Sequence, residues 1–570
     1  MNKENNHYEG KNKKEKENKE SHAAEKNEFA GLLCNLYMIA LLAVLPLYTG
    51  EGYWKLGDTK YILFRNVSFL CLGFWLILKI WEQVRLWARA LWNRKPGKPL
   101  SEREGMVRKK SFSVVDLAVA AYGCSVAVSA LCSSYGALAW NGYNEWYMGA
   151  VSQLMFVGIY FFVSRQYDGS QYPLYMGVGA FGLVTLFGLL HRLGIDPLGL
   201  QTGWNNGDWE YNHMLSTLGN INWLCGFYSV ALAWLLANYF REKRRSFQVA
   251  AYMAALGAYV LLGIQGSQGG LLILGVSVVV CFLLGWGQKM MFRKLTLLLA
   301  GFFLCMPFID WLTKLREEMA AVAADGNVFD HVVWYAWFWA AAVCIVLYFI
   351  SLLGLFQRVE DWIHRSITHN GWLSGKKWFP GKGRQGIIPV FGLSAGVVLI
   401  VCCLLWGGGR GGLFGIEDSF GSGRGFLWRI GAEGFARADW KEKLLGAGPD
   451  CYGEAVFRRL GEGTDVWNGE HWEGAIFTNA HNEIISQLIN VGIMGTICYL
   501  AIFLAGIWRY CFGGKQLKYG RWMGTLAIVM YGAHAMISFQ QVLNAPLLFL
   551  TLGLCEYGMR ETSSRGPDGK

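Results

Sequence analysis

The stretch GGLLILGVSVVVCFLLGWG at residues 269–287 decides the fold class, because it holds no charged side chain over a length that spans a lipid bilayer. A transmembrane helix needs about 20 mainly apolar residues to cross a hydrocarbon layer of about 30 Å. Hydrophobic residues make up 53% of the 570-residue chain and charged residues only 16%, which is typical of a membrane protein. The sequence therefore predicts an all-α, polytopic integral membrane bundle.

Similar apolar runs recur along the chain and predict about 12 to 14 membrane spans. They cover 30–48, 61–80, 113–132, 146–164, 173–191, 217–238, 248–265, 269–287, 295–312, 332–355, 387–407, 493–510, 522–540 and 543–558. The connection 79–112 has ten basic and three acidic residues. Short cytoplasmic loops are enriched in Lys and Arg, and with fourteen spans the basic connections share one side. Both termini are therefore predicted to be cytoplasmic.

The polar segments set the domain boundaries. Residues 1–29 hold seven Lys and seven Glu with few apolar residues, which predicts a disordered cytoplasmic tail. Residues 408–480 carry eight basic and eleven acidic residues and fall on the side opposite the basic loops. The net charge of +11 thus follows from topology and gives nucleic-acid binding little support. The predicted units are the tail 1–29, a main bundle 30–407, an extracytoplasmic loop 408–492 with short interfacial helices, C-terminal spans 493–558 and a cytoplasmic tail 559–570.

Within the outer loop, Gly421-Ser422-Gly423 precedes a helical pattern over residues 424–437. Ser422 is a candidate N-cap. A helix start presents unpaired backbone N–H groups, and Arg424 adds a planar fork that matches phosphate oxygens. The pattern predicts an anion site at Arg424 and Gly423. The alternative is a capped surface helix with Arg424 paired to a carboxylate.

A second helix is predicted to begin at Asn479, with apolar residues repeating on one face up to Ile489. His481 would then lie in the first turn, where the helix dipole disfavours imidazolium and keeps the ring neutral, as a general base requires. The alternative is that His481 only helps to cap the helix. Asn482 is a neighbouring candidate for substrate binding.

Other polar residues carry weaker hypotheses. His534 is predicted in the middle of a span, where an ionisable group is costly and suggests function or a hydrogen bond between helices. A group of polar residues at and after the end of the fifth span has two interpretations: the side chains line an outward-facing cavity, or they are solvated loop groups. The group consists of His191, Arg192, Asp208, Glu210 and His213. His471 and His481 are ten residues apart, which is no recognised ligand spacing, so neither a metal nor another cofactor is predicted.

The order of short motifs resembles the O-antigen ligase and polymerase superfamily. The matching pieces are Gly-Ser-Gly-Arg-Gly-Phe-Leu-Trp at 421–428, Leu-Leu-Gly-Ala-Gly-Pro-Asp at 444–450, Ala-His-Asn-Glu at 480–483 and Val-Gly-Ile-Met-Gly at 491–495. Upstream, residues 216–222 look like that family's Gly-Asn-x-Asn segment at the start of a span. Together they cover roughly residues 130 to 558.

The resemblance implies a membrane glycosyltransferase that takes a glycan from a polyprenyl diphosphate carrier to an acceptor hydroxyl outside the cytoplasmic membrane. Arg424 would stabilise the leaving diphosphate, and His481 would accept the proton of the hydroxyl. The expected acceptor is a glycan, a lipid or a protein, and membrane lipid is a further expected partner. The transfer reaction is expected to need no metal. The further residues expected to bind substrate are Gly423, Arg429, Asn482, Gln268, Arg192 and Asn220.

One position departs from the family pattern. Many members carry Ser-Arg-Gly where this chain has Ser267-Gln268-Gly269, so a usual diphosphate-binding cation is missing. Arg429, Arg192 or Arg410 would have to replace it, or the donor binds differently, or activity is altered.

The rival hypothesis is a transporter or other non-catalytic membrane protein, which predicts broken helices and polar groups at the bilayer midplane. The aromatic side chains of the outer loop have two interpretations, stacking on sugars or packing the loop onto the membrane. They are Trp440, Tyr452, Trp467 and Trp472.

Overall fold

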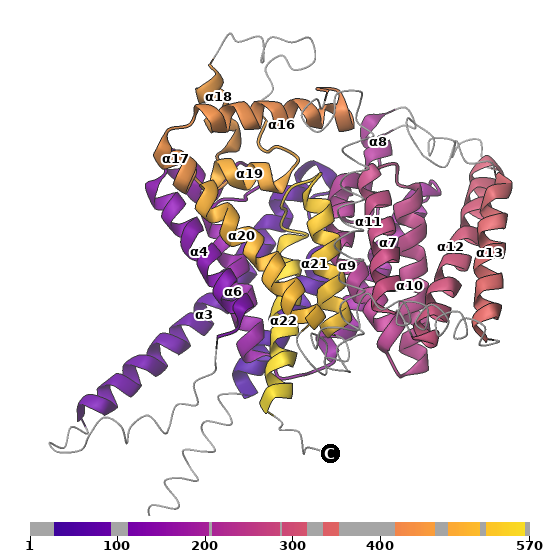
Figure 1. The fold of residues 1–570 in the computed structure, drawn as a ribbon, viewed down its shortest axis with the longest axis horizontal. Coiled ribbons are helices and arrows are strands. Elements are labelled where there is room, and N and C mark those ends of the chain that lie inside the picture. Colours follow the sequence, from indigo (N-terminus) through magenta and orange to yellow (C-terminus); the bar gives the residue numbers. More distant parts are fainter. Residues whose placement is uncertain are drawn as a thin grey trace, which may run out of the picture.

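The computed structural model describes residues 28–92, 112–204, 208–285, 288–315, 334–352, 417–461, 477–512 and 520–564. Over these residues the protein is a bundle of long helices with a group of short helices across one end (Figure 1). Nine of the described helices are long and apolar enough to cross a bilayer. The predictions of an all-α fold and of a multi-pass membrane protein are confirmed for this part of the chain.

The long helices follow the predicted order. They are Glu28–Leu47, α3 (Leu56–Trp92), α4 (Val114–Cys132), α6 (Ala150–Gln166), α7 (Tyr172–Arg192), α9 (Ile221–Arg241), α10 (Arg245–Ile264), α11 (Gln268–Leu284), α12 (Lys289–Leu315), α13 (Trp334–Leu352), α20 (Gly492–Ile507), α21 (Gly520–Ala535) and α22 (Ala545–Ser564). The predicted span 387–407 lies outside the described residues. Helix already begins at Glu28, and α22 runs past the predicted end at 558.

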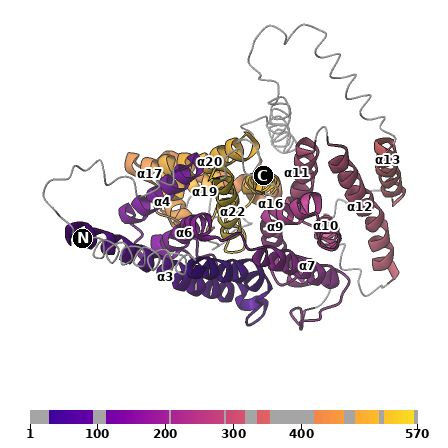
Figure 2. The same ribbon diagram turned by 90° about the horizontal axis from the view of Figure 1, so that it is seen from below.

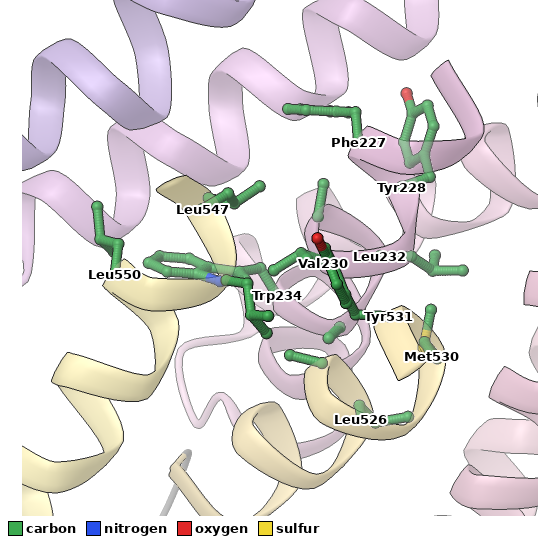
Figure 3. Close-up of a cluster of buried hydrophobic side chains, with 14 of the residues drawn as sticks. Phe227, Tyr228, Val230, Leu232, Trp234, Leu526, Met530, Tyr531, Leu547 and Leu550 are labelled. Carbon is green, nitrogen blue, oxygen red and sulfur yellow. The ribbon is translucent and has the colours of Figure 1, made fainter. Parts of the chain in front are cut away.

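Helix α9 is the centre of the bundle. In its membrane-length window 94% of residues are buried, against 17% in the window of α3. Figure 3 shows the reason, because Trp234 and Val230 of α9 lie among side chains of α21 and α22 such as Tyr531 and Leu547. Trp234 also donates its indole N–H to the Thr551 hydroxyl of α22 at 2.8 Å. By contrast α3 and the α12–α13 pair lie at opposite edges of the bundle (Figure 2), where their apolar side chains suit contact with lipid.

The short helices form a cap, which we define as α16 (Phe420–Arg437), α17 (Trp440–Leu445), α18 (Tyr452–Leu460) and α19 (Glu483–Asn490). The cap has a hydrophobic core of its own, which includes Ile430, Tyr452 and Ala455. In Figure 1, α16 lies across one end of the bundle, and the last described helix, α22, ends at the other. The predicted loop subdomain is therefore a distinct unit at one end of the bundle. Its location on the extracytoplasmic side is still a prediction.

The described chain also starts at the end away from the cap. Asn35, in the first helix, donates to the Asp168 carboxylate at 2.8 Å, just beyond the end of α6. Helix α6 begins at the cap end, since Asp450 of the cap accepts hydrogen bonds from the backbone of Tyr143 and Met148 directly before it. Both ends of the described chain thus share one end of the bundle, and the cytoplasmic location of the two tails is still a prediction.

A buried ion cluster joins three helices at that same end. The Asp116 side chain, fully buried near the start of α4, is 2.6 Å from Arg560 of α22 and 3.1 Å from Arg165 of α6. Tyr160 and the backbone N–H of Ser113 also donate to its carboxylate, each at 2.8 Å. One carboxylate therefore holds the ends of α4, α6 and α22 together.

Glycines bring two of the sequence motifs into backbone contact. Gly446 has φ +84°, and a Cβ there would lie 2.2 Å from the backbone oxygen of Asn490. Gly492 has φ +68°, and its Cβ would lie 2.5 Å from the backbone N of Gly446. The backbone N–H of Ala447 donates to Ile489 at 2.8 Å. The motifs at 444–450 and 491–495 thus need glycine to join α17, α19 and α20.

Replacing Gly446 with alanine is therefore expected to lower stability by about 2 kcal/mol or more, since it adds a steric clash to left-handed backbone. The thermal midpoint of the protein in detergent measures the effect. Gly461→Ala is the matched control, because Gly461 has the same φ of +84° and its Cβ would meet nothing within 4 Å among the described residues. Equal thermal midpoints for the two variants would show that the close contact of Gly446 with Asn490 does not affect stability.

Candidate functional site

The segment before Arg424 is a left-handed turn. Gly421, Ser422 and Gly423 have φ values of 60°, 61° and 91°, so the regular part of α16 begins at Arg424. An N-cap residue normally has extended backbone. The prediction that Ser422 caps the helix is wrong, and Ser419 holds the N-cap position without a side-chain hydrogen bond. Gly423 is needed for the turn that directs Arg424 toward the bundle.

Arg424 is held by this turn and does not pair with a carboxylate in the described part of the chain. Its Nη1 donates to the backbone oxygen of Gly421 at 2.9 Å, and its buried Nε has no hydrogen-bond partner there. Its positive charge acts on Cys225 of α9, on His481 before α19 and on His534 of α21. Arg424 therefore reaches from the cap to the bundle.

His481 lies before α19 and not in its first turn. The helix begins at Glu483, and Asn482 is its N-cap, accepting from the backbone N–H groups of Ile484 and Ile485 at 3.0 and 3.2 Å. The predicted helix start at Asn479 is wrong. Instead the Asn479 side chain accepts from the His481 N–H at 2.9 Å, and His481 has φ +47°. Because the carboxamide oxygen of Asn482 is used in the cap, the structure gives Asn482 a positioning role.

The imidazole of His481 packs edge-on against Phe539, with ring centroids 4.8 Å apart. Burial and, secondarily, the charge of Arg424 lower the pKa of His481 to about 4. The ring is therefore neutral near pH 7, as the sequence predicted. The cause differs from the prediction, because burial and Arg424 replace the helix dipole.

His534 joins the same group. It lies one residue before the end of α21, so the prediction of a mid-span position is wrong. Gly226 of α9 makes room for it, since a Cβ there would approach His534, Gln541 and Asn544 within 3.4 Å. His534 Nδ1 and both polar atoms of the Gln541 side chain are buried without partners among the described residues. With Arg424 Nε they form a cluster of unused hydrogen-bonding groups between cap and bundle, and buried polar groups normally have partners.

The start of α9 meets the start of α11 beside this cluster. Asn220 ends a two-residue antiparallel ribbon (Met214–Leu215 with Gly219–Asn220) and caps α9 by accepting from the Asn222 N–H at 2.8 Å. Asn222 in turn accepts from the Ser267 hydroxyl at 3.1 Å, and Ser267 is the N-cap of α11. Gln268 is exposed at this helix start. Asn220 therefore caps α9, whereas the Gln268 side chain is exposed and could contact a substrate.

Three arginines are the candidates for the cation that Gln268 does not supply. Arg192 is buried at the end of α7 and donates to the backbone oxygen of Gln265 at 2.6 Å, while its Nε has no described partner. Arg429 is exposed and paired with Asp418 at 2.6 Å and with Glu433 at 3.3 Å. Arg410 lies outside the described residues. The geometry favours Arg192, which donates to Gln265 in the turn leading to Gln268.

The weaker candidates separate into buried and exposed groups. His191 is buried and accepts from the Ser216 N–H at 3.1 Å, which supports a structural role. In the loop, His213 stacks on Trp209 at 4.4 Å. Trp440 is 78% exposed at the start of α17, whereas Tyr452 is buried and donates to the backbone oxygen of Leu427 at 2.8 Å. Trp467, His471 and Trp472 lie outside the described residues.

Sequence reasoning missed a buried polar network next to His481. Tyr122 of α4 donates to Gln153 of α6 at 2.9 Å and accepts from Gln487 of α19 at 3.1 Å, and Gln153 donates to Gln540 at 2.6 Å. Glu483 accepts from Tyr531 at 3.0 Å and also from Tyr499. The only signal in the sequence is the presence of Gln153 and Tyr122 within otherwise apolar runs.

A pocket of about 500 Å³, including space open to solvent, lies over this network. Its wall contains Tyr122, Trp146, Gln153, Asp450, Glu483 and Phe539 among others. Phe539 is shared with the His481 contact, so the pocket and the Arg424–His481–His534 cluster adjoin. In the described part of the chain, no group of three or more His, Cys, Asp or Glu is arranged to hold a metal ion.

The fold and these side chains define a multi-pass helical membrane protein with a polar site between the end of its bundle and a helical cap. No family model matches the sequence. No curated protein matches it either.

Proposed function

We propose that the protein is a membrane glycosyltransferase that moves a glycan from a polyprenyl diphosphate carrier to an acceptor hydroxyl on the extracytoplasmic face. The observation that carries the proposal is the meeting of Arg424, His481 and His534 between cap and bundle, since Arg424 acts electrostatically on both imidazoles. These residues come from three separate segments of the chain. This is the chemistry expected from the resemblance to O-antigen ligases and polymerases.

The donor presents a diphosphate that must gain negative charge as it leaves. Arg424 has a buried Nε–H without a described partner and a guanidinium that matches phosphate oxygens. A preorganised cation placed where charge develops stabilises the transition state more than the ground state. Arg192, whose Nε is also unpartnered among the described residues, would supply a second charge near Gln268. Arg424 is the proposed phosphate-binding residue of the transfer.

His481 supplies the base. Its neutral imidazole accepts the proton of the acceptor hydroxyl while the oxygen attacks the anomeric carbon, and the bond from that carbon to the diphosphate oxygen breaks. The electron pair leaves with the polyprenyl diphosphate, so the anomeric configuration inverts. A bound diphosphate would offset the charge of Arg424 and raise the pKa of His481 from about 4 toward the range of an efficient base. Donor binding would thus prepare the base for the reaction.

His481→Ala tests the proposal. We expect polyprenyl-diphosphate-linked glycan to accumulate and surface glycan to be lost, because removing a general base slows proton transfer about 100-fold or more. Both pools are measured in cells that carry equal amounts of native or variant protein in their membranes. His213→Ala is the matched control, since His213 is partly exposed at the end of the short helix α8 (Trp209–His213) and stacks on Trp209.

Unchanged glycan pools in His481→Ala would overturn the role of His481 as the base. The rival hypothesis of a transporter or non-catalytic protein would then take first place. Loss of surface glycan in the His213 control would instead point to a general defect in the protein.

A further inference from the structure

Among the described residues, no basic side chain lies in the wall of the pocket beside His481. Its polar lining consists of carboxamides, hydroxyls and two carboxyl groups, those of Asp450 and Glu483. Burial raises the pKa of Asp450 to about 7, although two backbone N–H groups donate to it. Burial likewise raises the pKa of Glu483 to about 8. Near neutral pH Glu483 is mainly protonated and Asp450 is partly ionised, so the wall has no positive charge to offer the diphosphate that Arg424 would bind.

Aromatic rings form part of the same wall. Trp146, which is half-buried, packs edge-on against Phe539 at 4.8 Å and against Trp223 at 5.8 Å. These contacts fix the plane of the indole while part of its surface stays open to the pocket. A fixed indole in a pocket is a platform for the C–H face of a sugar ring, as it combines large apolar area with little conformational freedom.

The carboxamides supply the polar part of such a site. Gln153, Gln487 and Gln540 are held by one another and by Tyr122, so their orientations are fixed. Asn490 also lines the pocket, and its buried Oδ1 has no hydrogen-bond partner among the described residues. Fixed groups that both donate and accept are suited to hydroxyl groups, which do the same.

We propose that this pocket binds an uncharged sugar residue, held by Trp146 and by the carboxamides, next to the base. Phe539 touches His481 on one side and lines the pocket on the other, so its ring lies between the pocket and the imidazole. Its assignment as the acceptor end of a glycan rests on the proposed transferase function. The binding of a neutral sugar does not.

Saturation-transfer NMR of the full-length protein in detergent tests the inference. The probes are methyl glycosides of glucose, galactose, mannose and N-acetylglucosamine, with glucuronic acid as a charged comparison. We expect at least one neutral glycoside to receive saturation, and Trp146→Ala to weaken its binding about tenfold. Asn490→Leu, which keeps the side-chain size, should weaken it by a smaller factor. The uronate should bind least.

Trp54→Ala is the matched control, because Trp54 is 81% exposed and lies outside the pocket wall. Saturation transfer to a neutral glycoside that is unchanged in both Trp146→Ala and Asn490→Leu would overturn the inference. So would the absence of saturation transfer from the native protein to any neutral glycoside. The thermal midpoint of each variant shows whether a loss of sugar binding comes from unfolding. If Trp146→Ala unfolds, the binding measured with Asn490→Leu decides the test.

The same measurement on His481→Ala separates the two proposals. If His481→Ala still binds the sugar and the glycan pools stay normal, the pocket is a carbohydrate-binding site and the proposed transferase function is excluded. If His481→Ala loses glycan transfer but the native protein binds none of the glycosides, the proposed transferase function stands. The proposal that this pocket binds a sugar is then excluded.

Discussion

Arg424→Ala is expected to reduce glycan transfer about 100-fold or more, because it removes a preorganised cation from the place where the leaving diphosphate gains charge. The half-buried guanidinium has a free Nε–H among the described contacts and acts electrostatically on His481 and His534. The measurement is the ratio of carrier-linked to surface glycan at matched protein level. Arg424→Lys should recover only part of the activity, since an ammonium cannot form the paired contact of a guanidinium.

Arg437→Ala is the control for this prediction. Arg437 lies in the last turn of the same helix, is exposed, and donates weakly to the backbone oxygen of Arg459 at 3.5 Å. Equal losses in the two variants would mean that transfer depends on the overall charge of α16. Full activity in Arg424→Ala would exclude Arg424 as the phosphate-binding residue.

Asp116→Ala should have the largest effect on stability, about 3–5 kcal/mol, because it leaves two partly buried guanidinium groups without their carboxylate. Arg165 and Arg560 both bind Asp116 at the end of the bundle away from the cap. The thermal midpoint in detergent measures the loss. Glu51→Ala is the control, since Glu51 forms only an exposed pair with Lys55 at 2.8 Å, and pairs of that kind contribute little. A midpoint for Asp116→Ala equal to that of the control would show that the cluster does not hold α4, α6 and α22 together.

The spans were predictable because lipid imposes a length and a composition on every crossing helix. Thirteen of the fourteen predicted ranges overlap described helices, nine of the described helices are long and apolar enough to cross a bilayer, and the remaining range lies outside the described residues. The polar segment that contains the cap could be recognised for a related reason. Its polar residues cannot enter the bilayer, yet its apolar residues are enough for a small core.

The site could be predicted only as a set of residues. Arg424 and His481 were proposed from their sequence motifs, and their functional roles stay predictions, but the sequence did not show the local backbone geometry. Asn479 and Asn482 are both suitable N-caps, and tertiary contacts select Asn482. Ser422 has the residue type of a cap but adopts left-handed backbone. His534 was misplaced because hydropathy does not show where α21 ends.

The cap and the bundle have separate hydrophobic cores, one around Ile430 and Tyr452 and the other around α9. Yet the cluster of Arg424 with His534 has one member on each, so neither core alone can assemble it. The proposed transfer would therefore depend on the contacts that join cap and bundle, such as those of Glu483 with Tyr531 and of Asp450 with the backbone of Tyr143. A substitution at this junction is expected to lower the transfer even where it leaves Arg424 and His481 unchanged.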